Sequence, residues 1–187
     1  MIALQKGAPG KLLIVVGVAL VWVAFFRLNE FCFSFFAFSN RAHWIFLPAA
    51  VRILSVLLFD GLGAAGLMLG AYLTLPHEEI SNLPIELLVS SSSAIAPLVA
   101  VAACRRWLCI AWDLSGLRGR HVVIVSVASA AANAFFLNLA LFVADQTIGK
   151  GEQIVTVFVG DLLGTAIVLS GIVAVLSLTA PRTQRRI

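Results

Sequence analysis

Residues 154–178, IVTVFVGDLLGTAIVLSGIVAVLSL, decide the fold class of this chain. The run is almost wholly apolar and carries one charged residue, Asp161. A helix that crosses the hydrocarbon core of a bilayer needs about 20 mainly apolar residues. The run therefore predicts a transmembrane helix. Its single carboxylate predicts a paired or functional group, because an ionisable side chain inside a bilayer is costly.

The composition of the whole chain leads to the same class. Hydrophobic residues make up 61% of its 187 residues, and charged residues make up 12%. A soluble domain is typically about 25% charged, so this chain has too little polar surface to cover a water-soluble globule. We expect an all-α, polytopic membrane protein that forms one integral membrane domain without a soluble domain. The net charge of +4 lies mainly in short loops and tails, and it predicts membrane orientation rather than nucleic-acid binding.

Five further apolar runs complete a predicted six-helix transmembrane bundle. The expected helices are 12–26, 44–59, 61–75, 86–103, 121–144 and 154–178. The second and third meet at the tight turn Asp60-Gly61 and should form a helical hairpin. The apolar stretch 31–38 either extends the first helix or lies in the membrane interface, with its aromatic rings at the level of the lipid headgroups.

Basic residues gather on one side of this expected topology. Nine lie on the side of the N-terminus: Lys6, Lys11, Arg105, Arg106, Arg118, Arg120, Arg182, Arg185 and Arg186. Three lie on the other side, namely Arg27, Arg41 and Lys150, and Arg52 lies within a helix. Lys and Arg are enriched in cytoplasmic segments of membrane proteins. Both termini are therefore predicted to be cytoplasmic.

Two opposite charges lie at matched depth in the outer half of the predicted bundle. Arg52 is eight residues from the outer end of its expected helix, and Asp161 is seven from the outer end of its own. At 1.5 Å per residue, both lie about 10 to 12 Å below the outer boundary. We predict that they pair directly. The pair is a structural ion pair, part of a ligand pocket, or part of a proton relay or transport path.

Other polar residues at similar depth predict a cavity that opens toward the outside. Asn138 lies in the outer part of the fifth helix, Asn133 lies deeper, and four serines follow the start of the fourth helix. The proposed ligand-binding residues are Arg52, Asp161, Glu86, Ser91 and Asn138. Two alternatives remain open. In the first, the serines hydrogen-bond only to the backbone of their own helix, as serines in membrane helices often do. In the second, Glu86 is a solvated charge at the membrane interface.

The cytoplasmic loop 104–120 is a candidate docking surface. The proposed partner-binding residues are Arg105, Arg106, Trp112 and Arg118. Exposed arginine and tryptophan are enriched at binding hot spots. Alternatively, Trp107 and Trp112 anchor helix ends at the interface, and the arginines set the topology or attract anionic lipid.

Small residues and histidines add little chemistry. Gly66-x-x-x-Gly70, Gly160-x-x-x-Gly164 and the alanines Ala96, Ala100 and Ala103 have helix-packing spacing. They serve packing within the chain or oligomerisation. No HExxH, GxSxG or phosphate-binding loop is present in the sequence. We therefore expect no enzyme activity, no cofactor and no metal site, although His43 and His77 fall on the same predicted side.

The order of these motifs resembles the bacterial membrane-associated sensor domain family of the first type. The resemblance covers about residues 12 to 178. It rests on Trp44-Ile45-Phe46-Leu47-Pro48-Ala49-Ala50-Val51-Arg52, the Asp60-Gly61 turn, the glycine-rich helix Gly61 to Leu75, Arg105-Arg106, Asp113-Leu114 and Gly160-Asp161-Leu162-Leu163-Gly164. Ala50 stands where the family tends to have glycine. The resemblance implies a sensor in the bacterial inner membrane that feeds a cytoplasmic output domain, such as a histidine kinase or a diguanylate cyclase.

Three functions remain as hypotheses. Because residues 1–187 contain no output domain, the first is a sensory or ligand-binding bundle that acts through a separate membrane or cytoplasmic protein. Its ligand would be a small molecule from the outer side. The second is the substrate-binding subunit of an energy-coupling-factor transporter, which would dock through the alanines of the fourth helix. The third is an accessory subunit of a larger membrane complex.

Overall fold

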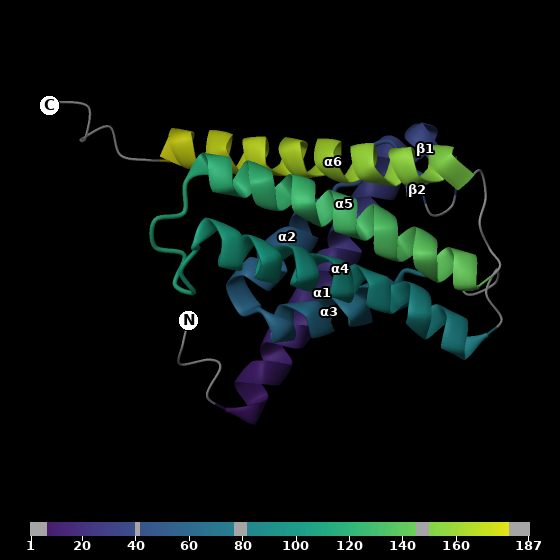
Figure 1. Ribbon diagram of the computed structural model, residues 1–187, viewed down its shortest axis with the longest axis horizontal. Helices are drawn as coiled ribbons and strands as arrows, with labels where there is room; N and C mark the ends of the chain where they lie inside the picture. Colours follow the sequence, from purple (N-terminus) through teal and green to yellow (C-terminus); the bar gives the residue numbers. More distant parts are fainter. Residues whose placement is uncertain (1–6, 40–41, 77–81, 145–149, 180–187) are drawn as a thin grey trace, which may run out of the picture.

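The computed structural model describes residues 7–39, 42–76, 82–144 and 150–179 (Figure 1). These ranges hold six α-helices, one 3-10 turn and one short β-hairpin. The elements are α1 (Ala8–Phe33), η2 (Ser34–Phe36), β1 (Ala37–Ser39), β2 (Ala42–His43), α2 (Pro48–Phe59), α3 (Gly61–Leu73), α4 (Leu83–Leu108), α5 (Gly119–Val143) and α6 (Lys150–Thr179). The all-α prediction is confirmed, and the antiparallel β1–β2 pair is a minor addition.

The segment between α1 and α2 differs most from the prediction. α1 continues to Phe33, so Arg27 lies inside a helix rather than in a loop. The second helix begins at Pro48 rather than at residue 44, because residues 44–47 form a turn. This turn is held by side-chain and backbone contacts that the sequence pattern does not reveal. The Leu47 N–H donates to Oδ1 of the buried Asn29 at 2.8 Å, and the Phe46 N–H donates to the Gly160 carbonyl at 3.1 Å.

Among the described residues, four helices are long and apolar enough to cross a membrane, namely α1, α4, α5 and α6. α2 has 12 residues and α3 has 13. At 1.5 Å per residue they are about 18 and 20 Å long, whereas the hydrocarbon core of a bilayer is about 30 Å thick. The structure thus supports a membrane protein with four candidate spans, and it does not confirm the six spans predicted from the sequence.

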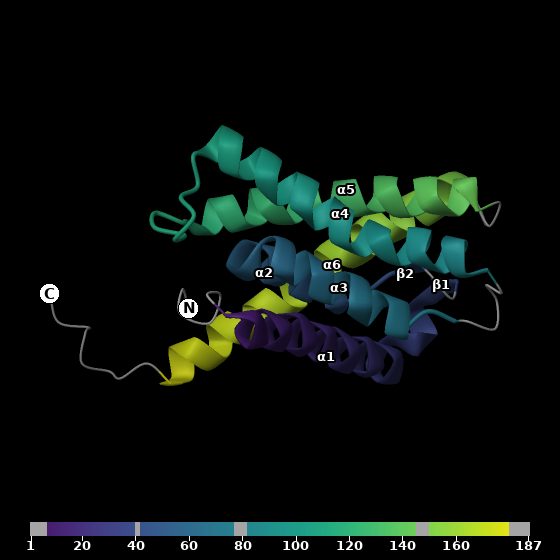
Figure 2. The same ribbon diagram turned by 90° about the horizontal axis from the view of Figure 1, so that it is seen from below.

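Connections gather at two opposite ends of the bundle (Figures 1 and 2). The first end, here the loop end, holds the start of α1, the connection of α4 to α5 over residues 109–118, and the end of α6. The second end, here the hairpin end, holds β1, β2 and the end of α5. The start of α1 and the end of α6 therefore lie at the same end of the bundle.

Glycines of α3 allow it to pack closely on α1. A Cβ at Gly66 would lie 2.6 Å from the Cβ of Val18, and one at Gly70 would lie 2.8 Å from the Cβ of Trp22. Real Cβ atoms do not approach so closely, so only glycine fits at both positions. The Gly66-x-x-x-Gly70 motif therefore packs helices within the chain, which was one of its two expected roles.

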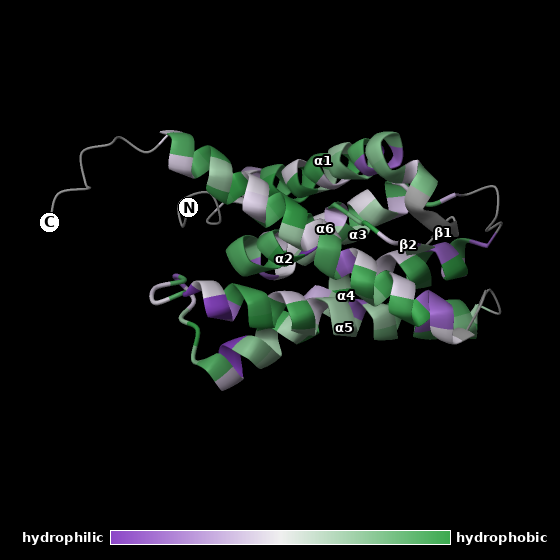
Figure 3. Ribbon diagram, turned by 90° about the horizontal axis from the view of Figure 1, so that it is seen from above, coloured by the Kyte–Doolittle hydropathy of each residue, from purple (hydrophilic) through white to green (hydrophobic). Residues whose placement is uncertain are grey.

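The outer surface of the bundle is strongly apolar. Figure 3 shows hydrophobic residues along most of the helix lengths, with hydrophilic residues concentrated toward the two ends. Large side chains such as Leu12, Phe142 and Leu178 are 64 to 85% exposed. Water-soluble monomers rarely expose contiguous apolar patches beyond a few hundred Å². A lipid environment explains this surface.

Candidate functional site

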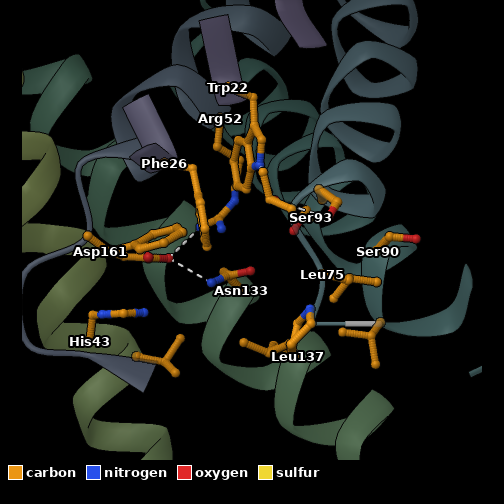
Figure 4. Close-up of a pocket in the computed structure, with 16 residues that line it drawn as sticks. Trp22, Phe26, His43, Arg52, Leu75, Ser90, Ser93, Asn133, Leu137 and Asp161 are labelled. Carbon is orange, nitrogen blue, oxygen red and sulfur yellow. Dashed lines mark hydrogen bonds and ion pairs between the residues drawn. The ribbon is translucent and has the colours of Figure 1, made fainter. Parts of the chain in front are cut away.

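The predicted pair between Arg52 and Asp161 is confirmed, and a third residue joins it (Figure 4). The Arg52 Nη1–H donates to Asp161 Oδ2 at 2.6 Å, and both side chains are only 4% exposed. The Asn133 Nδ2–H donates to the same oxygen at 2.8 Å. Burying the two opposite charges together lowers the cost of burying each one. The cluster joins α2, α5 and α6, which are far apart in the sequence.

The two glycines beside Asp161 explain how α2 reaches α6. A Cβ at Gly160 would collide with the carbonyl oxygen of His43, and a Cβ at Gly164 would collide with that of Phe46. The backbone of residues 43–47 therefore lies directly on α6. This contact sets where α2 starts, and Arg52 follows one turn after Pro48. The Gly-Asp-Leu-Leu-Gly motif thus serves packing within the chain and places the carboxylate beside Arg52.

Aromatic rings form one wall of the site. Trp22 and Phe46 meet edge to face with ring centroids 5.9 Å apart, and Phe26 meets Phe46 at 6.4 Å. The Arg52 guanidinium carbon lies 5.5 Å from the Trp22 ring centroid and 5.7 Å from that of Phe46. These distances suit cation–π attraction, which adds to the ion pair in stabilising the buried guanidinium. The Trp22 Nε1–H also donates to Thr74 Oγ1 at 3.1 Å, which fixes the indole ring.

The ion pair and the aromatic wall border a cavity. Its volume is about 90 Å³, measured as the space open to the centres of water molecules, and residues from all six helices line it. Ser90, Ser93 and Leu137 also line the cavity. One water needs about 10 to 15 Å³ on this measure. The cavity therefore has room for several waters or one small molecule.

Three buried polar atoms of cavity-lining residues have no hydrogen-bond partner among the described residues: Arg52 Nε, Asn133 Oδ1 and His43 Nδ1. Arg52 and Asn133 are 3% and 1% exposed. Leaving a buried donor or acceptor unbonded costs about 1 to 3 kcal/mol, and most such groups in native proteins are bonded to protein or to water. Residues that line the cavity thus hold at least one unbonded donor and one unbonded acceptor.

Three of the proposed ligand-binding residues lie outside this cavity. Glu86 is only 7% exposed, so it is not a solvated surface charge. The Ser91 hydroxyl donates to the Leu88 carbonyl at 2.7 Å on an exposed part of α4. Asn138 donates to the Ala134 carbonyl at 2.7 Å and lines a separate apolar cleft.

Ser90, Ser93, Asn133 and His43 line the cavity instead. Depth along a helix follows from residue number, whereas the face that a residue presents depends on how the helix packs. The spacing of Ser90 and Ser93, and of Asn133 and Leu137, would put each pair on one helix face. That periodicity was the available signal in the sequence.

At the loop end, Arg105 belongs to the fold rather than to the surface. Its Nη2–H donates to the Leu57 carbonyl at 3.0 Å, and its Nη1 lies 3.8 Å from Asp60 Oδ1. Its guanidinium carbon lies 4.1 Å from the centroid of the Trp112 ring. The Arg105 side chain is only 9% exposed, whereas Trp112 is 73% exposed. Arg106 and Arg118 are also exposed, so three of the four proposed docking residues lie at the surface.

The described residues contain no group of three or more His, Cys, Asp and Glu side chains placed to hold a metal ion. His77 lies outside the described residues, so its position relative to His43 is not described. Comparison with protein-family models, with curated proteins and with solved structures finds no match to this chain.

Proposed function

We propose that this chain is a six-pass protein of the bacterial inner membrane that binds a small molecule and acts through a separate partner protein. The observation that carries the proposal is the cavity beside Arg52, Asp161 and Asn133, with its buried and unbonded donor and acceptor atoms. Ionisable residues within membrane helices mark functional sites by default. The resemblance to the membrane-associated sensor domain family agrees with this function.

The contact of Arg105 with the α2–α3 turn supports six passes. The Leu57 carbonyl and Asp60 meet Arg105 near the last turn of α4, so the turn reaches the loop end although both helices are short. We place the loop end in the cytoplasm, because Arg105, Arg106, Arg118 and Arg120 lie there. The hairpin end then faces outward. This topology also puts both termini in the cytoplasm.

Native cysteines test this topology. Cys32 and Cys109 are exposed near the hairpin end and the loop end, and Cys104 is buried as an internal control. A membrane-impermeant maleimide should label Cys32 in intact cells, and Cys109 only after permeabilisation. Labelling of both from one side would contradict the topology. In a cysteine-free background, Gly61→Cys should be labelled only from the cytoplasmic side. Protection from both sides would instead mean a re-entrant hairpin and four spans.

α2 supplies a route from the cavity to the cytoplasmic face. Arg52 near its start lines the cavity, and the Leu57 carbonyl near its end accepts a hydrogen bond from Arg105. Arg105 in turn stacks on the exposed Trp112. A ligand that shifts α2 would therefore move the surface around Trp112. We propose that a partner protein docks on this surface, formed by Arg106, Trp112 and Arg118.

The transporter hypothesis is the second candidate, because it would use the same cavity. The burial of two alanines argues against the docking surface proposed for it on the fourth helix. Ala96 and Ala100 are 0% and 4% exposed and pack within the chain. An accessory subunit without a ligand is the third candidate, and in that case the cavity would hold water only.

The deciding experiment is purification in mild detergent, followed by mass spectrometry of the proteins that co-purify. A kinase or cyclase supports sensing, and a coupling ATPase supports transport. The double variant Trp112→Ala/Arg118→Ala should weaken association by about 2 kcal/mol or more, since exposed tryptophan and arginine act as hot spots. Phe35→Ala, which removes a 96% exposed ring near the hairpin end, is the matched control. Retention of every partner by the double variant would exclude docking on this surface.

A further inference from the structure

The cavity is electrically balanced before any ligand enters. Among its lining residues, Arg52 carries one positive charge and Asp161 one negative charge, and the two are in direct contact. His43 also lines the cavity, and burial lowers its pKa, which favours the neutral ring, while the charge of Glu30 acts in the opposite direction. A charged ligand would therefore leave one unpaired charge beside the aromatic wall. Isolated charges are strongly disfavoured in such surroundings.

The hydrogen-bonding atoms that remain are of both kinds. Arg52 Nε–H is a donor and Asn133 Oδ1 is an acceptor, and neither has a partner within the described residues. Ser90, Ser91 and Ser92 donate to carbonyls of their own helix. No such bond is found for Ser93 in the described part of the chain, and Ser93 lines the cavity. Figure 4 shows Ser93 and Asn133 projecting into the same space as the Arg52 side chain.

We propose that the cavity binds a neutral, planar amide-type group, a carboxamide or a urea. Its carbonyl oxygen accepts from the Arg52 Nε–H, and its N–H donates to Asn133 Oδ1 or to the Ser93 hydroxyl. One group thus satisfies the unbonded donor and the unbonded acceptor without adding charge. This inference rests on the proposed ligand-binding function, and it names the class of ligand.

The size of the cavity agrees with a small group. A cavity of about 150 Å³ in another protein holds benzene, which has six heavy atoms. The cavity here has about 90 Å³, which suits a group of about four heavy atoms. The aromatic rings of Trp22 and Phe46 lie beside this space and offer flat faces to a planar group.

Acetamide, acetate and acetamidinium provide the test, because they share one planar shape and differ in charge. Each is titrated at constant ionic strength into the full chain in lipid nanodiscs, and the tryptophan fluorescence is followed. Trp22→Phe identifies the part of the signal that arises in the cavity. We expect saturable binding of acetamide, with an affinity on the order of millimolar for so small a ligand. We expect acetate and acetamidinium to bind at least about tenfold more weakly, which corresponds to about 1.4 kcal/mol.

Two serine variants localise the binding. Ser93→Ala should weaken acetamide binding several-fold, whereas Ser91→Ala, two residues away on the same helix, should leave it unchanged. Asn133→Leu should abolish binding, but it also removes a hydrogen bond to Asp161. Ser93→Ala is therefore the cleaner variant, because it leaves the cluster of Arg52, Asn133 and Asp161 intact. Equal effects of the two serine variants would overturn the assignment of the hydroxyl.

The outcomes separate the two proposals. Tighter binding of acetate or acetamidinium than of acetamide would overturn the neutral ligand class and leave the ligand-binding function standing. No saturable binding of any of the three would overturn both proposals, since the cavity would then hold water only.

Discussion

Replacing one member of the Arg52–Asp161 pair should destabilise the protein far more than replacing both members. Arg52→Met leaves the Asp161 carboxylate buried without its counterion, and Asp161→Leu leaves the Arg52 guanidinium buried without its counterion. At a charge separation of about 4 Å and an effective dielectric constant of about 20, the attraction lost is about 4 kcal/mol. Truncating one partner of a buried pair typically costs about 3 to 5 kcal/mol. We expect each single variant to lie in this range.

The double variant Arg52→Met/Asp161→Leu should be more stable than either single variant, because it leaves no buried unpaired charge. Unfolding is measured by thermal denaturation in detergent, and the double-mutant cycle yields the coupling energy between the two sites. The exposed pair Arg27–Glu30, at 3.0 Å, is the matched control. Its coupling energy in the cycle Arg27→Met/Glu30→Leu should stay below about 1 kcal/mol. If the Arg52 and Asp161 effects simply add, the two side chains are not in contact, and the site described here is wrong.

Three further predictions concern the supports of the site. Gly160→Ala places a Cβ against the His43 carbonyl and should cost about 1 to 3 kcal/mol, whereas Gly171→Ala on the same helix meets open space and should be near neutral in the same thermal assay. Arg105→Ala should cost about 1.5 to 3 kcal/mol through the lost bond to Leu57 and should raise quenching of tryptophan fluorescence by acrylamide, a neutral quencher, because one face of the Trp112 ring is uncovered; the exposed Arg106→Ala should do neither. Burial lowers the pKa of His43, so the unfolded chain takes up a proton at about pH 6.5 and the folded chain only at lower pH. The contribution of His43 to stability is therefore complete above about pH 6.5 and declines as the pH falls below that value, and His43→Gln should remove this slope.

Much of the membrane character and part of the site were predictable from local patterns. Hydropathy over 12–26, 86–103, 121–144 and 154–178 located the four long helices, because lipid selects apolar side chains along the whole span. The pairing of Arg52 with Asp161 was also predictable, since close pairing lowers the cost of burying two opposite charges at equal depth. Asn133 lies deeper in its helix, and depth alone does not predict its bond to Asp161.

The sequence by itself thus determined that lipid surrounds this protein, and how deep its polar residues lie. Both follow because hydropathy and the rise per residue are properties of each apolar run alone. It could not determine which residues share a face. Each residue turns a helix by about 100°, so Ser91 and Ser93 lie on different faces although their depths are nearly equal. Only the tertiary structure decided that Ser93 meets the cavity. It also decided that the turn at 44–47 shortens α2, because that turn depends on Asn29 and Gly160, which lie elsewhere in the chain.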